Sequence, residues 1–183
     1  MKNLIIKYKS VIKFILTFLL TYAVLSIAYK LYLDYSTGTL YYPDYFTNLV
    51  ARQSETLFQV LGYNAEVVKH ANEPSMKVLV EGKFVSRVIE GCNSISVIIL
   101  FISFIIAFAD KFKATVIYLL AGSVLIYVVN LIRIVVLSVG LYHFPWRRNI
   151  LHTVIFPLII YGMVFLLWMI WVRRFAKIHN QDE

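Results

Sequence analysis

The sequence predicts a mainly α-helical integral membrane protein: a polytopic bundle of about four spans with a small extracytoplasmic insertion. Three observations predict this class. The 183 residues are 60% hydrophobic, with a mean hydropathy of +0.74, whereas a soluble domain is about 45–50% apolar. Apolar runs recur at lengths that suit a bilayer. Basic residues gather at the ends of those runs, as the positive-inside rule requires.

Four apolar runs account for the predicted spans. The first is 14–33, and its twenty residues, rising about 1.5 Å each, match a hydrocarbon core of about 30 Å. The others are 95–109, 114–132 and 151–172, and we expect the last to bend at Pro157. The run 134–144 is too short to be a span of its own. It is a helix extension, an interfacial helix or a re-entrant segment.

One substantial polar segment, 34–91, separates the first two spans. Helical spacing of its apolar residues predicts a helix over about 43–62. Three short alternating runs then predict a β-meander over about 65–90. The segments assigned to the inner side carry nine Lys or Arg against three acidic residues. The whole chain, 1–183, is therefore one membrane domain with both termini in the cytoplasm and this insertion outside.

Charge and cysteine content exclude several classes of function. The net charge of +8 would suit nucleic acid, but the basic residues are placed at span ends, so we expect the lipid bilayer and no nucleic acid as a partner. A single cysteine excludes an intramolecular disulfide framework and a Cys-based zinc site. The possible metal ligands do not cluster at helical spacing, so no metal and no cofactor are predicted.

Polar residues distant in sequence are expected at one membrane boundary. Cys92 is the only cysteine, and it stands just before the apolar run that begins at Ile95. A thiol at the N-terminal end of a spanning helix meets the helix dipole and unpaired N–H groups, which favour the thiolate. Asn130 and Arg133 near the end of the third span, and His152 at the start of the fourth, reach the same outer boundary under this topology.

These residue types form a coherent set for acyl transfer. Cys92 would attack a carbonyl, His152 would carry the thiol proton to a leaving amine, and Arg133 would stabilise the oxyanion. Each also has a simpler interpretation. The cysteine is then a small buried hydrophobe, the arginine a snorkelling anchor, and the histidine an interface residue. His143, ten residues after Arg133, is a rival candidate for the base.

Four further residues are assigned to substrate binding or orientation: Gly91, Asn93, Ser94 and Asn130. Asn130, one helical turn before Arg133, would orient the guanidinium or bind substrate. Gly91 would leave room for a substrate backbone beside the thiol. Glu90 would oppose thiolate formation if it were close, so we expect it to end a strand or to pair with Arg87.

The ordered set of residues resembles the exosortase/archaeosortase family of membrane transpeptidases. The resemblance is carried by Cys92 at the mouth of an apolar helix, by Asn130-Leu-Ile-Arg133-Ile, and by His152 opening the last helix. The segments 90–99 and 155–162 are most similar to a Bacteroidetes subgroup called exosortase F. Many relatives have Cys-Ser-Gly where this chain has Cys92-Asn93-Ser94, and a Gly about four residues after the His, where this chain has Phe156.

The resemblance implies a protein-sorting reaction. A cysteine transpeptidase of this type, in the bacterial inner membrane, cleaves the C-terminal sorting tails of exported proteins at the outer face and passes the acyl group to an acceptor. Its partners would be those exported proteins and an acceptor that the sequence does not identify. Its catalytic residues would be Cys92, Arg133 and His152. Two other hypotheses are a membrane cysteine peptidase that uses water, and a non-catalytic small membrane assembly subunit.

Overall fold

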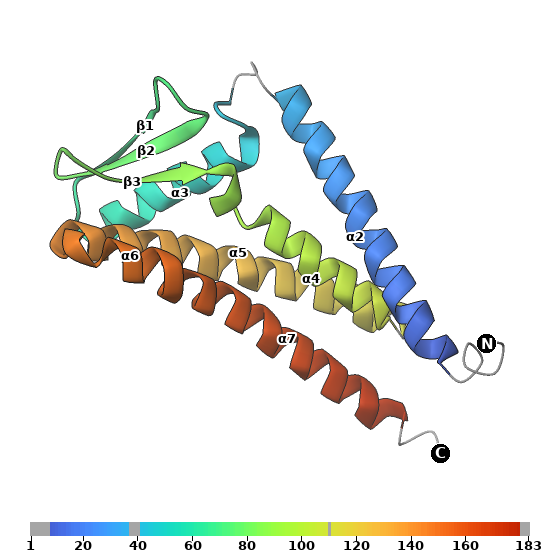
Figure 1. Ribbon diagram of the computed structural model, residues 1–183. Coiled ribbons are helices and arrows are strands. Elements are labelled where there is room, and N and C mark those ends of the chain that lie inside the picture. The colour runs from blue at the N-terminus through green and yellow to red at the C-terminus, as the bar shows by residue number, and fades with distance from the viewer. Residues whose placement is uncertain (1–7, 37–40, 110, 180–183) are drawn as a thin grey trace.

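Most of the described chain is helical, and a small sheet lies at one end of the helices (Figure 1). The computed structural model describes residues 8–36, 41–109 and 111–179, without the side chains of 152 and 175–179. Some of the charged residues behind the predicted orientation, in 1–7, 110 and 180–183, lie outside these ranges. The prediction of a mainly helical chain with a small β-meander is confirmed.

Three long apolar helical segments could cross a membrane by length and composition. The first two are α2 (Lys9–Ser36) and α5 (Phe112–His143). The third consists of four consecutive pieces: η2 (Pro145–Arg147), α6 (Arg148–Ile150), the π-helical η3 (Leu151–Ile155) and α7 (Phe156–His179). Because α5 is continuous to His143, the run 134–144 is a helix extension, the first of the three alternatives.

The second predicted span is shorter than expected. It forms α4 (Ile95–Ala107), a helix of 13 residues, which is about 20 Å long at 1.5 Å per residue. The chain turns after Ala107 because Phe108 and Ala109 bond back to the carbonyls of the last helical turn. The predicted span ended at 109, whereas α4 ends at Ala107. Four spans are present only if this shorter helix also crosses the membrane.

Close packing joins the helices into one bundle. α2 packs along α4, and α4 packs against α5 and α7. The Phe101 ring of α4 lies directly over Gly122 of α5, where an added Cβ would be 2.3 Å from Phe101 Cζ. Small residues allow such close approach between membrane helices. The start of α2 and the end of α7 lie at the same end of the molecule, away from the sheet (Figure 1).

The insertion between α2 and α4 is a helix covered by an antiparallel sheet. Its elements are α3 (Tyr45–Val60), β1 (Ala65–Lys69), β2 (Ser75–Val80) and β3 (Lys83–Ile89), with strand order β1-β2-β3. Asp44 caps α3 by accepting the Thr47 N–H at 3.0 Å. Buried side chains of α3 and the sheet form one core with Ile134 and Val135 of α5. The insertion is thereby fixed to the C-terminal half of α5.

The predicted bend at Pro157 corresponds to a change of helix type. The five residues Leu151–Ile155 form the π-helical η3, directly before Phe156 and Pro157. Proline has no N–H, so the carbonyl one turn earlier loses its usual α-helical partner. A π-helical turn is one way in which a helix accommodates such an interruption, and π-turns are frequent at functional sites.

Candidate active site

Cys92 ends a short 3₁₀ turn, η1 (Glu90–Cys92), which links β3 to α4. Its thiol is free and half-buried. Helix α4 begins only at Ile95, with Ser94 as its N-cap at a left-handed φ of +65°. The cysteine therefore precedes the helix by about one turn, and the helix begins at the predicted residue.

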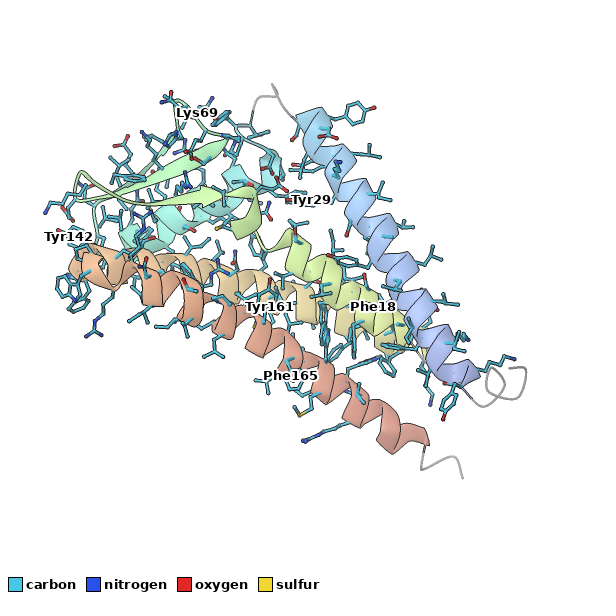
Figure 2. All side chains as sticks on the ribbon, in the orientation of Figure 1. Phe18, Tyr29, Lys69, Tyr142, Tyr161 and Phe165 are labelled. Carbon is cyan, nitrogen blue, oxygen red and sulfur yellow. The ribbon has the colours of Figure 1, made fainter. Side chains whose placement is uncertain are left out.

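Asn93 holds the turn after the cysteine in place. It is 1% exposed. Its Nδ2 donates to Tyr29 Oη at 2.7 Å and to Thr47 Oγ1 at 3.2 Å, while its Oδ1 accepts the Ile95 N–H at 3.0 Å. Figure 2 shows Tyr29 on α2 beside this junction. Asn93 was predicted to bind or orient substrate, but its amide is engaged within the protein and joins α2 and α3 to the start of α4.

Asn130 fixes the backbone of the cysteine itself. It lies on α5, is 1% exposed, and donates from Nδ2 to the Cys92 carbonyl oxygen at 2.7 Å. A buried carbonyl left without this donor would cost about 1–3 kcal/mol. The sequence predicted that Asn130 orients the guanidinium or binds substrate. The described contact instead positions Cys92.

Arg133, one turn further along α5, lies beside the cysteine. Its side chain and that of Cys92 border the same small cavity. Its Cζ lies 4.5 Å from the centroid of the Phe156 ring, a stacking distance for a guanidinium on an aromatic face. Its Nε is buried and has no hydrogen-bond partner among the described residues. The structure thus brings Cys92 and Arg133 together and leaves a buried donor available.

The space around these two side chains is small. A cavity of about 30 Å³ is bounded by Cys92 and Arg133, by β3, by α5 and by Phe156. That volume holds about one water molecule. A hydrogen bond between Ser86 Oγ and Ser138 Oγ, 2.7 Å long, ties β3 to α5 at the same cavity. This volume is far smaller than a peptide.

The two candidate histidines are placed differently. The backbone of His152 is in η3, but its side chain lies outside the described residues. It is four residues before Phe156, which is about one helical turn along the axis. The ring of Phe156 stacks on Arg133. His143 ends α5, about 15 Å along the axis from Arg133. Its Nε2 is 3.3 Å from Tyr63 Oη, so the described structure does not bring it to the thiol.

A second, larger pocket borders the first two residues of η1. It has a volume of about 630 Å³ and is bounded by Glu90 and Gly91, the end of α2, and the start of β2. A Cβ added to Gly91 would meet nothing within 4 Å, as expected for a residue beside open space. Arg87 borders both cavities and pairs with Glu73, not with Glu90. Burial and the negative charge of Asp44 raise the pKa of Glu90.

Sequence reasoning missed several residues of the site. Phe156 stacks on Arg133, and its position four residues after His152 was noted only as a departure from the family pattern. Tyr29 was counted within an apolar span, and nothing in that run distinguishes it as a partner of Asn93. The Ser86 to Ser138 contact joins a strand to a helix, and no spacing rule predicts it. Comparison of the chain with family models, curated proteins and solved structures finds no match.

Proposed function

We propose that the protein is an exosortase-type cysteine transpeptidase. It cleaves the C-terminal sorting tails of exported proteins at the outer face of the bacterial inner membrane and transfers the acyl group to an acceptor. The observation that carries this proposal is that the Cys92 and Arg133 side chains border one small cavity. A cysteine that only fills space has no need of a cation nearby, and an arginine that only anchors a helix has no need of a thiol. The shared cavity, with the Arg133 Nε buried and without a hydrogen-bond partner among the described residues, suits a nucleophile next to a stabiliser of negative charge.

The reaction assigns one role to each group. The proton of the Cys92 thiol passes to His152, and the thiolate attacks the scissile carbonyl carbon. The planar guanidinium of Arg133 donates to the tetrahedral oxyanion. Collapse of this intermediate expels the amine, which takes the proton from His152, and leaves a thioester on Cys92. The acceptor then releases the acyl group and restores the thiol. Asn130 acts through the Cys92 backbone as a positioning residue.

The membrane arrangement follows from the same proposal. α2, α4, α5 and the segment ending in α7 cross the membrane, with both termini in the cytoplasm and the insertion outside. The shared end at which α2 starts and α7 finishes supports an even number of crossings (Figure 1). The shorter α4 then spans a locally thinned or protein-shielded region. Cys92 and Arg133 meet at the sheet end, where a membrane-anchored tail emerges.

The small size of the cavity beside the thiol affects how substrate would enter. Phe156 covers the guanidinium, and β3 covers the other side of the cavity. The π-helical η3 directly before Phe156 has a weaker hydrogen-bonding pattern than an α-helix. Entry of a sorting tail displaces this wall, which exposes the guanidinium to the substrate carbonyl.

Two experiments separate this proposal from its alternatives. Under the non-catalytic hypothesis Cys92→Ser leaves function intact, because the side chains are close in size, whereas the transpeptidase and the water-dependent peptidase both lose processing. Hydroxylamine then separates those two: an acyl-enzyme open to other acceptors yields a hydroxamate-tailed product, and a strict hydrolase yields the free acid. Wild-type processing by Cys92→Ser, at matched expression and membrane insertion, would reject the catalytic proposal.

A further inference from the structure

The pocket of about 630 Å³ beside η1 has a strong imbalance of charge. Four carboxylates border it, from Asp34, Asp44, Glu73 and Glu90. Arg87 is the basic residue among the described residues that line it, and Arg87 is already paired with Glu73. Glu90 has no ion-pair partner in the described part of the chain.

The environment of Glu90 shows that this charge is not compensated. Its pKa is raised by burial and then by the charge of Asp44, which is 2% exposed and caps α3. Both carboxylates border the same pocket, and a like charge nearby disfavours ionisation. A cation bound between them would relieve that repulsion.

A buried hydroxyl provides a second and independent observation. Ser75, the first residue of β2, borders the same pocket and is fully buried. Its Oγ has no hydrogen-bond partner among the described residues. A buried hydroxyl without a partner costs about 1–3 kcal/mol, so a native site usually supplies one. A ligand donor in this pocket would satisfy it.

The kind of cation follows from the spacing of the acceptors. In the described residues no three carboxylate, His or Cys side chains converge as a metal site. A primary ammonium group instead carries three donors that can reach acceptors on different elements. Glu90 in η1, Asp44 before α3 and Ser75 in β2 come from three different elements and border the same pocket. The open end beside Gly91 leaves room for the rest of the molecule.

We propose that this pocket binds the primary ammonium group of the acyl acceptor, which makes it the acceptor site for the thioester on Cys92. The role of the pocket as an acceptor site rests on the proposed function. The binding of an ammonium group in the pocket does not. In the transfer, the bound ammonium gives one proton to the Glu90 carboxylate and becomes a nucleophilic amine. Its nitrogen bonds to the thioester carbon, the C–S bond breaks, and the second proton goes to the departing Cys92 thiolate. An amide, the free thiol and a protonated Glu90 result.

Ligand-observed NMR on the full chain in phosphatidylcholine nanodiscs tests the binding site, with ethylamine as the probe and ethanol as its neutral match. We expect saturation transfer to ethylammonium and none to ethanol. Glu90→Gln should weaken ethylammonium binding about fivefold, the effect of one partly exposed charge contact, and Ser75→Ala should weaken it as well. Glu66→Gln, which removes an exposed carboxylate on β1, is the matched control and should bind as wild type. Equal binding by wild type and Glu90→Gln, or equal binding of ethanol, would overturn the inference.

Two further binding experiments identify the source of the amine and separate failure of the acceptor site from failure of the proposed function. Phosphoethanolamine carries the ammonium of a lipid headgroup: tighter binding than ethylamine assigns a headgroup, and weaker binding assigns a small free amine. The Cys92→Ser variant should bind ethylammonium as wild type does. If it binds normally and also processes substrate normally, the pocket stands and the proposed function fails. If it loses processing while no variant binds ethylammonium, the function stands and the acceptor site fails.

Discussion

Arg133→Met should raise stability while it strongly slows processing. Methionine keeps an unbranched side chain that can still contact the Phe156 ring, but it removes the charge and the buried Nε donor. If Arg133 only packed helices, its loss would lower stability and activity together. If it serves the reaction, the two quantities should move in opposite directions, because functional groups are often held at a cost to the fold.

The contacts of Arg133 give the size of each effect. An unpartnered buried donor costs about 1–3 kcal/mol, and the stacking of a guanidinium on a ring returns about 0.5–2 kcal/mol. Arg133→Met therefore gains about 1 kcal/mol. For a chain of this length that gain raises Tm by roughly 2–4 °C. Loss of the oxyanion donor should lower the rate of processing about 100- to 1000-fold.

Two measurements on the same preparations test whether stability and processing rate change in opposite directions. Thermal unfolding in detergent, followed by intrinsic fluorescence, gives Tm, and the rate of tail cleavage per folded molecule gives activity. Arg133→Lys keeps the charge without the planar fork and should fall between wild type and Arg133→Met. Ser138→Ala is the local control: it breaks the hydrogen bond to Ser86 in the same cavity, lowers stability by about 1 kcal/mol, and retains processing. A Tm loss in Arg133→Met that accounts for its activity loss would refute a catalytic arginine.

Three other variants probe the surroundings of Cys92. Asn130→Ala leaves the Cys92 carbonyl without its hydrogen-bond donor and should lower the free energy of chemical unfolding by about 1–3 kcal/mol. An unchanged unfolding midpoint would show that this hydrogen bond does not stabilise the fold. Ser94→Gly removes the strain of a left-handed residue and should stabilise by about 1 kcal/mol, and a lower Tm would contradict it. Glu90→Gln should raise Tm at neutral pH, because a carboxyl with a raised pKa in the folded state loses stability as pH rises above its unfolded pKa. That difference should vanish at acid pH, where both states are protonated, and a difference that grows on acidification would have the wrong sign.

The elements of the fold were predicted well where sequence pattern and burial agree. The helix expected over 43–62 is Tyr45–Val60, and the meander expected over 65–90 is Ala65–Ile89 with its two turns. The alternating apolar residues face the core shared with α3 and α5. β2 begins at Ser75, which pairs with Ile89 of β3 in the ladder. Such a pairing depends on the partner strand and leaves no local signal.

Depth in the membrane could be inferred from the sequence, but direction around a helix axis could not. Span lengths predicted that Cys92 and Arg133 lie at one level, and the structure places both at one small cavity. The same reasoning placed Cys92 just before an apolar helix that begins at Ile95, and α4 begins there, after the left-handed Ser94. Glycine would adopt the conformation of Ser94 without strain.

The partners of the buried amides were beyond a single sequence. Asn93 bonds to Tyr29 and Thr47, which come from two elements far earlier in the chain. Each of those residues has an ordinary explanation, as a tyrosine near a span end or as a polar residue of a helix. Their convergence depends on how α2 and α3 pack against α4, which is a tertiary property.

We propose that the single thiol of this chain carries the acyl group, and its removal in cells is a direct test. Cells that express Cys92→Ala, at levels and with membrane insertion matched to wild type, should accumulate sorting-tail substrates uncut. Wild-type protein purified after exposure to substrate should carry a hydroxylamine-labile adduct on Cys92. Cleaved substrate in the Cys92→Ala cells would contradict the account, because no other thiol in the chain could replace the nucleophile.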